Sequence, residues 1–286
     1  MTDAGEYSGY VLDPESPVEM ARLINLDRFM TKGMGGPLVG VNNLSPLHNI
    51  LDMACGPGGW VLDVAFERPE AEVAGVDISK IMIDYAGARA QSQQIPNASF
   101  GVMDITRPLD FADGTFDLVN ARFLFSVLLQ EQWPGFIAEC TRILRPGGVL
   151  RLTELIDGGA TNSPAKEQLH GFFCQALQRV KHGFSVNGRS IGMTIMLPRF
   201  LRNAGYQQVQ HLMHALEVSA DTEVYSDFYQ NSKITYLLAR PLFLNTGVTT
   251  AEEFDRTYQQ MLNELNSDNF TGMWHYMTAV GVKPLS

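Results

Sequence analysis

The fold class is best predicted from the stretch of residues 50–60, Ile-Leu-Asp-Met-Ala-Cys-Gly-Pro-Gly-Gly-Trp. Its first residues are mostly apolar and its last are rich in glycine, so a buried strand leads directly into a tight turn. Glycine lets the backbone approach a ligand more closely than any side chain allows, and the helix that follows presents unpaired N–H groups. Strand, glycine turn and helix in this order predict the ligand-binding corner of a doubly wound α/β sheet.

Apolar runs and helical patterns alternate around this corner, from residue 48 to residue 154. Such alternation is typical of βαβ units and a parallel sheet. The pattern resumes with a helix at 197–204 and a strand at 207–218, and a last strand is expected at 270–283. The other expected strands lie near 48–54, 72–77, 98–103, 116–121 and 148–154, and the helices between them near 58–68, 80–92 and 130–145.

The composition excludes several classes of protein. The chain has 286 residues, of which 45% are hydrophobic, and a formal net charge of −10. The hydrophobic residues are numerous enough to form a folded core. The negative net charge argues against a nucleic-acid binder, because such proteins normally carry a basic surface. The three cysteines, Cys55, Cys140 and Cys174, are too scattered for a disulfide framework or a metal site. We expect a cytoplasmic protein with no bound metal, no nucleic-acid partner and no membrane segment.

Acidic residues stand at the ends of the first three expected strands. Asp52 lies within the first strand, Asp77 closes the second and Asp104 closes the third. A carboxylate at the end of the second strand can accept hydrogen bonds from both hydroxyls of a ribose. Asp104, followed by Ile105, suits the edge of an adenine. A dinucleotide fingerprint would need a glycine where this chain has Val61, so the pattern favours adenosine with an amino-acid tail over a pyrophosphate.

These motifs resemble those of the class I S-adenosylmethionine-dependent methyltransferases, especially the small-molecule branch related to ubiquinone-type and sterol-type enzymes. The resemblance is strong over residues 48–155 and weaker over 197–283. It implies a Rossmann-like, doubly wound, seven-stranded α/β sheet whose last strand is antiparallel. The motifs that carry it are Leu-Asp-Met-Ala-Cys-Gly-Pro-Gly-Gly (51–59), Gly-Val-Asp-Ile-Ser (75–79), Phe-Asp-Leu-Val-Asn-Ala-Arg (116–122) and Ile-Leu-Arg-Pro-Gly-Gly-Val-Leu (143–150).

The resemblance also implies which residues hold S-adenosylmethionine. Around the methionine part it places Asp52, Ala54, Gly56 and Gly58, and at the ribose Asp77. Around the adenine it places Ile78, Met82, Met103, Asp104 and Ile105, and at the sulfonium Asn120, Ala121 and Arg122. The glycine-rich segment at Gly33–Gly36 suggests that the N-terminal helix closes over the cofactor or reaches a neighbouring subunit, bringing Tyr10 and Arg28 to the cofactor's carboxylate end. The alternative is a helix packed permanently on the sheet.

The remaining segments predict a helical cap made by the N-terminus and two insertions. Ser16, Pro17 and Glu19 form the start signal of a helix over residues 14–31, and Gly33–Pro37 follows it as a flexible hinge. Ser163 caps an expected helix in the first insertion, and Thr250 with Glu253 forms a capping box in the second. We expect four parts: an N-terminal helical lid at 1–47, a cofactor-binding core at 48–155, a helical cap insertion at 156–196, and the rest of the sheet at 197–286 with a helical insertion at 221–268.

Methyl transfer from a sulfonium needs alignment and exclusion of water more than dedicated catalytic residues. A base matters only if the acceptor must lose a proton. Glu154, His170 and His182 are the candidates, and for either histidine a structural role is the plainer alternative. His211 and His214 are three apart on an expected strand and point to opposite faces, which argues against a metal pair.

The acceptor is expected to be a small hydrophobic molecule. Asn120-Ala-Arg-Phe123 differs from the Asn-Pro-Pro-Tyr motif of nucleic-acid amino methyltransferases, and the segments left to roof the site are rich in aromatic residues. Methylation of oxygen or carbon is favoured over nitrogen, and the N-terminal segment is a candidate contact in a homo-oligomer. Three alternatives stay open: a cyclase or decarboxylase that uses the same cofactor, a non-catalytic cofactor-binding protein and, more distantly, a nicotinamide-dependent dehydrogenase.

Overall fold

The computed structural model describes residues 11–13, 15–41 and 47–285, and its centre is one mixed β-sheet. The order of its strands is β3-β2-β1-β4-β5-β8-β6, and β7 pairs with β8. The first five strands are parallel, whereas β8 is antiparallel to both β5 and β7. The strands are β1 (Asn49–Met53), β2 (Glu72–Asp77), β3 (Ala98–Val102), β4 (Phe116–Arg122), β5 (Leu144–Leu155), β6 (Ala160–Thr161), β7 (Gln207–Glu217) and β8 (Gly272–Val282).

This topology confirms the predicted doubly wound sheet with an antiparallel last strand. Seven of the strands match the predicted positions, and the eighth, β6, is a two-residue addition that pairs with the start of β8. β5 begins at Leu144, four residues earlier than expected, because Leu144 pairs with Phe116 before a shift in register. The apolar side chains of β1 and β4 are almost fully buried, as expected for central strands covered on both faces.

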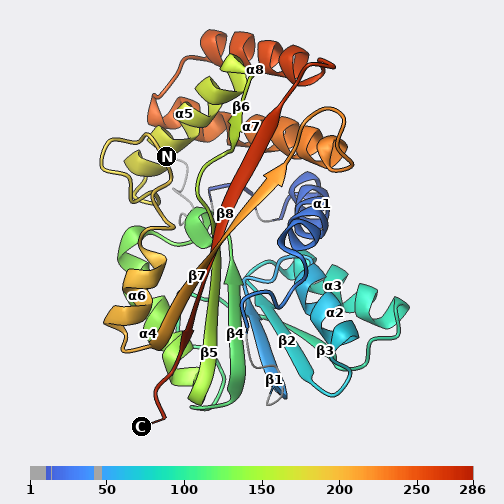
Figure 1. Ribbon diagram of the computed structural model, residues 1–286, viewed down its shortest axis with the longest axis vertical. Coiled ribbons are helices and arrows are strands. Elements are labelled where there is room, and N and C mark those ends of the chain that lie inside the picture. Colours follow the sequence, from blue (N-terminus) through green and yellow to red (C-terminus); the bar gives the residue numbers. More distant parts are fainter. Residues whose placement is uncertain (1–10, 14, 42–46, 286) are drawn as a thin grey trace, which may run out of the picture.

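Helices cover the sheet and also form a separate cap, which Figure 1 shows above the sheet. α2 and α3 pack near β2 and β3, and α4 and α6 pack near β5 and β7. The cap consists of α1, α5, α7 and α8. The helices are α1 (Pro17–Met34), α2 (Gly59–Glu67), α3 (Lys80–Ser92), α4 (Trp133–Ile143), α5 (Pro164–Arg179), α6 (Leu197–Asn203), α7 (Tyr225–Thr246) and α8 (Ala251–Leu265), and the short 3-10 turns are Leu124–Ser126 and Gln130–Gln132.

The helices of the cap start at the predicted capping residues. The side chains of Ser16, Ser163 and Thr250 each accept a hydrogen bond from a backbone N–H in the first turn of α1, α5 and α8. α1 is joined to α7 through a buried contact, in which the Arg22 guanidinium donates to Asn231 Oδ1 at 2.8 Å. The N-terminal helix is therefore part of the cap.

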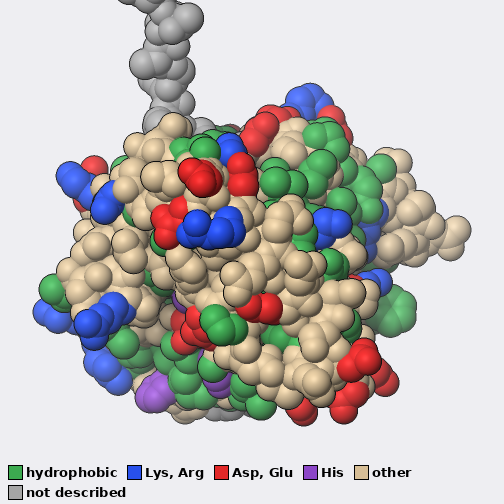
Figure 2. Space-filling model, turned by 90° about the horizontal axis from the view of Figure 1, so that it is seen from above, with side chains coloured by type: hydrophobic (Ala, Val, Ile, Leu, Met, Phe, Trp, Pro, Cys, Tyr) green, Lys and Arg blue, Asp and Glu red, His purple; other side chains and the backbone are tan. Residues whose placement is uncertain are grey.

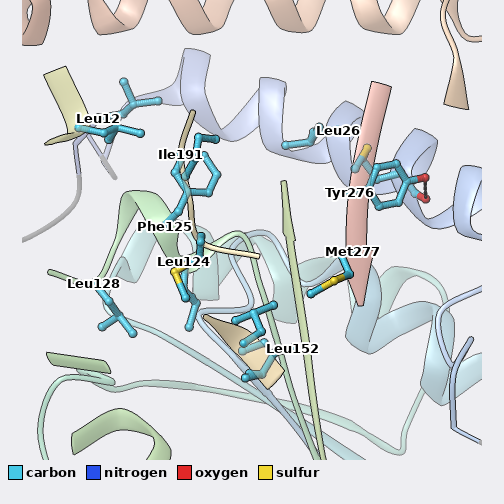
Figure 3. Packing of buried hydrophobic residues seen from close by; sticks show 14 of the residues in the cluster. Leu12, Leu26, Leu124, Phe125, Leu128, Leu152, Ile191, Tyr276 and Met277 are labelled. Carbon is cyan, nitrogen blue, oxygen red and sulfur yellow. Dashed lines mark hydrogen bonds between the residues drawn. The ribbon is translucent and has the colours of Figure 1, made fainter. Parts of the chain in front are cut away.

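β8 connects the cap to the sheet. It starts beside the cap and runs down between β5 and β7, near one edge of the sheet (Figure 1). At its upper end the Trp274 ring stacks on Phe29 of α1, with 5.4 Å between the ring centroids, and meets Phe228 of α7 edge to face. Figure 3 shows the hydrophobic cluster of which these residues are part. In that view Tyr276 lies at about the height of Leu26 of α1, and Met277 lies lower, toward Leu152 of β5.

α1 continues to Met34, and the glycine-rich segment after it is less hinge-like than expected. Gly33 is still helical, and Gly35, at φ 87°, ends the helix in the left-handed conformation that favours glycine. Gly33 also lies close to β8, since a Cβ atom placed there would come within 2.8 Å of the Tyr276 hydroxyl. Close packing explains this glycine better than flexibility does.

The outer surface shows no single dominant charge on the side of the cap. In Figure 2, acidic and basic side chains are interspersed there with hydrophobic ones. Within the described ranges, none of the helices has both the length and the apolarity needed to cross a bilayer.

Candidate functional site

A cavity of about 210 Å³ lies between the cap and the carboxyl ends of the parallel strands. Its floor comes from the segments that follow β1, β2, β3, β4 and β5, within residues 54–59, 77–82, 103–106, 122–127 and 155–158. Its roof comes from α1, α5 and α7, and Trp274 adds part of a wall. Ligands of doubly wound sheets bind at this edge, so the cavity is the candidate site.

The glycine turn after β1 forms a narrow part of the floor. Gly56 and Gly58 have φ values of 52° and 75°, which glycine adopts without strain. A Cβ atom on Gly58 would lie 2.6 Å from the Phe100 ring, so the turn is packed too closely for a side chain. Ala54 has φ 54° without being glycine. Such strain, of roughly 1–3 kcal/mol, clusters at functional sites.

Asp77 ties this turn to the end of β2. Its Oδ2 accepts a hydrogen bond from Gly56 N at 2.8 Å, and its Oδ1 accepts one from Ser79 N at 2.9 Å. Burial raises the pKa of the carboxyl group, and the backbone N–H groups act against that rise. Asp77 also lines the cavity, in the part where the sequence places the ribose.

The next part of the floor is an apolar slot with an acid at its edge. Ile78, Met82, Met103 and Ile105 line the slot. Asp104 Oδ1 accepts hydrogen bonds from the backbone N–H and the hydroxyl of Thr106, at 2.9 and 2.7 Å. An apolar slot with one carboxylate at the rim suits a flat heterocycle that carries an exocyclic amine.

Beneath the floor, a buried hydrogen-bonded chain supports Asp52. Asn120 Nδ2 donates to Asp52 Oδ1 at 2.7 Å, and the Arg151 guanidinium donates to Asn120 Oδ1 at 2.6 Å. Burial raises the pKa of Asp52 to about 7, against the attraction of Arg122. The chain runs across β1, β4 and β5 because these strands are neighbours in register. It fixes the carboxyl group of Asp52 at the cavity wall.

α1 is attached to the floor by an ion pair. Arg122, at the end of β4, donates to Asp27 of α1 and, at 3.1 Å, to the Thr31 hydroxyl. The Asp27 carboxylate lies directly over Gly59, where any Cβ atom would overlap it. Sequence reasoning found Arg122 but missed Asp27 and the supporting Arg151. A charged residue inside the apolar run of β5 was the available signal for Arg151.

Several residues expected to hold the cofactor are absent from the described cavity wall. Gly58, Asn120 and Ala121 lie behind the floor, where they shape or support it. Arg28 points outward from α1, with its side chain 69% exposed, and bonds Asp227 of α7 at 3.3 Å. Its place on the outer face of the helix removes it from the cavity. Tyr10 falls outside the residues that the structure describes. The other residues expected to contact the cofactor line the cavity: Asp52, Ala54, Gly56, Asp77, Ile78, Met82, Met103, Asp104, Ile105 and Arg122.

Of the three candidate bases, only His170 lines the cavity. Its Nε2 accepts a hydrogen bond from Gly158 N at 3.0 Å, and burial lowers its pKa to about 4, so the ring is neutral with its proton on Nδ1. His182 is buried behind Phe125, and its Nδ1 lies 3.1 Å from the Phe125 carbonyl oxygen. Both histidines therefore have structural contacts.

Glu154 is also behind the wall. Its Oε1 accepts a hydrogen bond from Leu124 N at 2.6 Å, while its Oε2 is buried and has no hydrogen-bond partner among the described residues within the usual distance and angle limits. Burial raises its pKa to about 8, so the group is mostly protonated at neutral pH. The bond to Leu124 N holds the 3-10 turn next to Phe123, which has φ 59° and lines the cavity. Glu154 is therefore placed to position this turn.

The half of the cavity under the cap is mainly apolar. Leu12, Phe125 and Ile191, all labelled in Figure 3, contribute to it. Polar side chains of the cap join them: Lys166 and His170 of α5, and Asn231, Ser232, Thr235 and Tyr236 of α7. Within the described part of the chain, His, Cys, Asp and Glu form no group of three or more that could hold a metal ion. The cavity thus combines a polar, acidic floor with an apolar roof.

Comparison with known proteins identifies the part of the chain that carries this floor. Residues 50–148, from β1 into β5, match the family model described as methyltransferase domain. Over 180 residues the chain is 28% identical to the trans-aconitate 2-methyltransferase of Deinococcus radiodurans. The aligned region covers 63% of this chain and 63% of that relative. Over 153 residues it is 35% identical to an uncharacterized methyltransferase of Schizosaccharomyces pombe, which covers 50% of this chain and 52% of that protein.

The chain therefore spans less than two thirds of the length of these curated relatives. Its fold is similar to that of the YcgJ protein from Bacillus subtilis, with a TM-score of 0.56 and 16% identity. That similarity covers 88% of this chain and 98% of the other. It extends the likeness of fold beyond the matched domain into the cap and the last strands.

Proposed function

The chain carries a class I S-adenosylmethionine-dependent methyltransferase domain, and from this premise we propose that it transfers a methyl group to the oxygen or carbon of a small hydrophobic acceptor. One observation carries the proposal. The floor with Asp77 and Asp104 and the apolar roof line the same cavity, so donor and acceptor would meet inside it. Holding two reactants together in a dry site is the main requirement of this reaction.

The residues of the floor fit the cofactor. Gly56 of the glycine turn lines the cavity without a side chain, Asp77 presents a carboxylate for two ribose hydroxyls, and Asp104 stands at the rim of an apolar slot for adenine. Asp52 and Arg122 would lie near the amino-acid end. When bound, S-adenosylmethionine supplies an electrophilic methyl group on a sulfonium. Arg28 stays outside this arrangement.

The side chains of the roof position the acceptor and exclude water. Phe125, Phe173 and Trp274 give it apolar contacts, and Glu154 holds the turn that carries Phe125. His170 lines the cavity as a neutral ring whose Nε2 accepts from Gly158 N. In this arrangement Glu154 and His182 act on the shape of the site, and neither has to remove a proton.

Calorimetric titration with S-adenosylhomocysteine and transfer of a labelled methyl group to cell extract test the proposal together. We expect binding, and label in a fraction of small organic molecules. Binding without transferred label, but with a cofactor-dependent product, would instead support a cyclase or decarboxylase. Binding without any product would support a non-catalytic protein. Absence of binding to the wild type would contradict the proposal.

Further features remain part of the same proposal. We propose the four-part division of the chain given above, a cytoplasmic location, no nucleic-acid partner, and self-association through the N-terminal segment. The acidic net charge of −10 supports the absence of a nucleic-acid partner. The attachment of α1 to the floor through Asp27 supports the role of the N-terminal segment as a lid.

A further inference from the structure

Lys166 is a buried cation in the roof of the cavity. It lies in the first turn of α5, only 1% exposed, and its side chain lines the cavity. The ammonium donates to the Gly158 carbonyl oxygen and lies 5.3 Å from the centre of the Phe228 ring. Among the described residues, no carboxylate lies within 4 Å of it, and Glu167 and Asp157 attract it only from farther away. Burial lowers its pKa to about 8, so it still carries its proton at neutral pH.

This position is unfavourable for a cation. A buried charge without a counter-ion costs free energy, because a single carbonyl and a ring replace its hydration incompletely. The first turn of a helix adds to the cost, since the N–H groups there carry partial positive charge. A methionine of similar length would fill the same space without either penalty. The contribution of Lys166 to the folded state alone therefore does not explain its presence.

Other donors surround the same part of the cavity. The Thr235 hydroxyl is buried, lines the cavity and has no hydrogen-bond partner in the described structure. His170, one turn after Lys166 on α5, has its ring proton on Nδ1. The acids that line the cavity are Asp52, Asp77 and Asp104 of the floor and Asp27 of α1, and Asp27 is already paired with Arg122. The roof thus offers positive charge and donors within apolar surroundings.

Resting on the proposed function, we propose that the acceptor is an apolar molecule with an acidic oxygen group, a carboxylate or an ionised phenol or enol, and that Lys166 and Thr235 bind this oxygen. The anion would supply the counter-ion that Lys166 lacks and the partner that the Thr235 hydroxyl lacks. The aromatic side chains of the roof would hold the apolar body.

An ionised oxygen also suits a wall in which the candidate bases are already engaged. If that oxygen is the atom methylated, one of its lone pairs forms the new O–C bond, and the electron pair of the broken C–S bond stays on sulfur. The sulfonium becomes a thioether, and the oxygen loses its negative charge. No proton has to be removed in this step, so the bond of His170 Nε2 to Gly158 N can stay intact.

The test compares an acid with its neutral counterpart: 2-naphthoate and 2-naphthamide, titrated by calorimetry into protein saturated with S-adenosylhomocysteine. We expect the wild type to bind the acid at least tenfold more tightly than the amide. Lys166→Met should lose this selectivity and keep its affinity for the amide within twofold. Thr235→Val should weaken only the acid, by roughly threefold to tenfold. Lys80→Met, which removes an exposed ammonium on α3, is the matched control.

Acid selectivity that is absent from the wild type, or that survives Lys166→Met, would overturn the inference. Thermal unfolding shows whether Lys166→Met is folded. We expect the Tm of this variant to equal or exceed that of the wild type, because an uncompensated buried charge has been removed. A lower Tm would assign Lys166 a structural role. Binding of S-adenosylhomocysteine to the wild type separates the two proposals: its loss contradicts the methyltransferase function, and its presence without acid selectivity contradicts only this inference.

Discussion

Asp77 connects the glycine turn to the end of β2 and faces the cavity at the same time. Replacing it with asparagine removes the charge and one acceptor while keeping the size of the side chain. We expect Asp77→Asn to weaken binding of S-adenosylhomocysteine by roughly tenfold to a hundredfold, since hydrogen bonds to charged groups contribute about 1.5–3 kcal/mol. Calorimetry measures the change. Asp84→Asn, an exposed acid on α3, should bind like the wild type, and equal affinities in both variants would contradict this role of Asp77.

Glu154 should make the stability of the protein depend on pH. Its pKa is raised from 4.5 to about 8 in the folded protein, so the folded state favours the protonated form. The resulting stabilisation is complete below pH 4.5 and is lost as the pH rises through 8. Relative to Glu154→Gln, which can still accept from Leu124 N, the wild type should lose at most about 5 kcal/mol across this range. Urea unfolding at pH 5 and pH 9 measures the difference, and a constant difference would disprove the shift.

The acids of the floor could be predicted because their positions depend on local pattern. Each follows an apolar run, and parallel strands bring their carboxyl ends to one edge, so Asp77 and Asp104 were found from the sequence. Asp27 and Lys166 were missed because their roles depend on contacts made after folding: the first on Arg122, 95 residues away, the second on burial under the cap. Nothing in the neighbouring sequence distinguishes them from surface charges.

Two glycines within helices, Gly33 of α1 and Gly87 of α3, differ in how closely their surroundings are packed. A Cβ on Gly33 of α1 would approach Tyr276 and Leu216 at 2.8–3.0 Å, whereas one on Gly87 of α3 would meet nothing within 4 Å. We expect Gly87→Ala to stabilise the protein by about 0.5–1 kcal/mol, the usual gain in a helix. Gly33→Ala should destabilise it by about 1–3 kcal/mol through overpacking. Denaturant unfolding compares them, and a gain at both sites would show that α1 can move away from β8.

Element positions followed from the sequence more closely than their tertiary contacts did. Capping residues predicted the starts of α1, α5 and α8, because a cap acts on the turn beside it. The end of α1 was predicted too early, at residue 31 instead of Met34. The glycine-rich segment that begins at Gly33 is typical of a hinge, but Gly33 itself is helical and packs against Tyr276 of β8. The sequence also gave no sign that Arg22 would bond to α7, since this contact joins residues 209 positions apart.

For the whole molecule, a ligand that bridges floor and lid should raise thermal stability. A ligand that binds only the folded state at a hundred times its Kd stabilises it by about 2.7 kcal/mol. For a protein of this size we expect S-adenosylhomocysteine at that concentration to raise the Tm by roughly 5 °C or more. Differential scanning fluorimetry measures the shift, with adenine as a ligand that reaches only the slot. An equal shift with adenine would show that the amino-acid end makes no contribution.

The position of β8 between β5 and β7 has a consequence for biosynthesis. A nascent chain emerges from its N-terminus, so β7 is made before residues 218–271 and must wait for β8, its strand partner in the described sheet. Until then the edges of both β5 and β7 are open, and open edges can recruit other chains. Because many outward side chains of β7 are polar, as at Gln208 and Gln210, the waiting strand presents a poor surface for association. Translation through the last strand thus sets the earliest time at which the sheet can close.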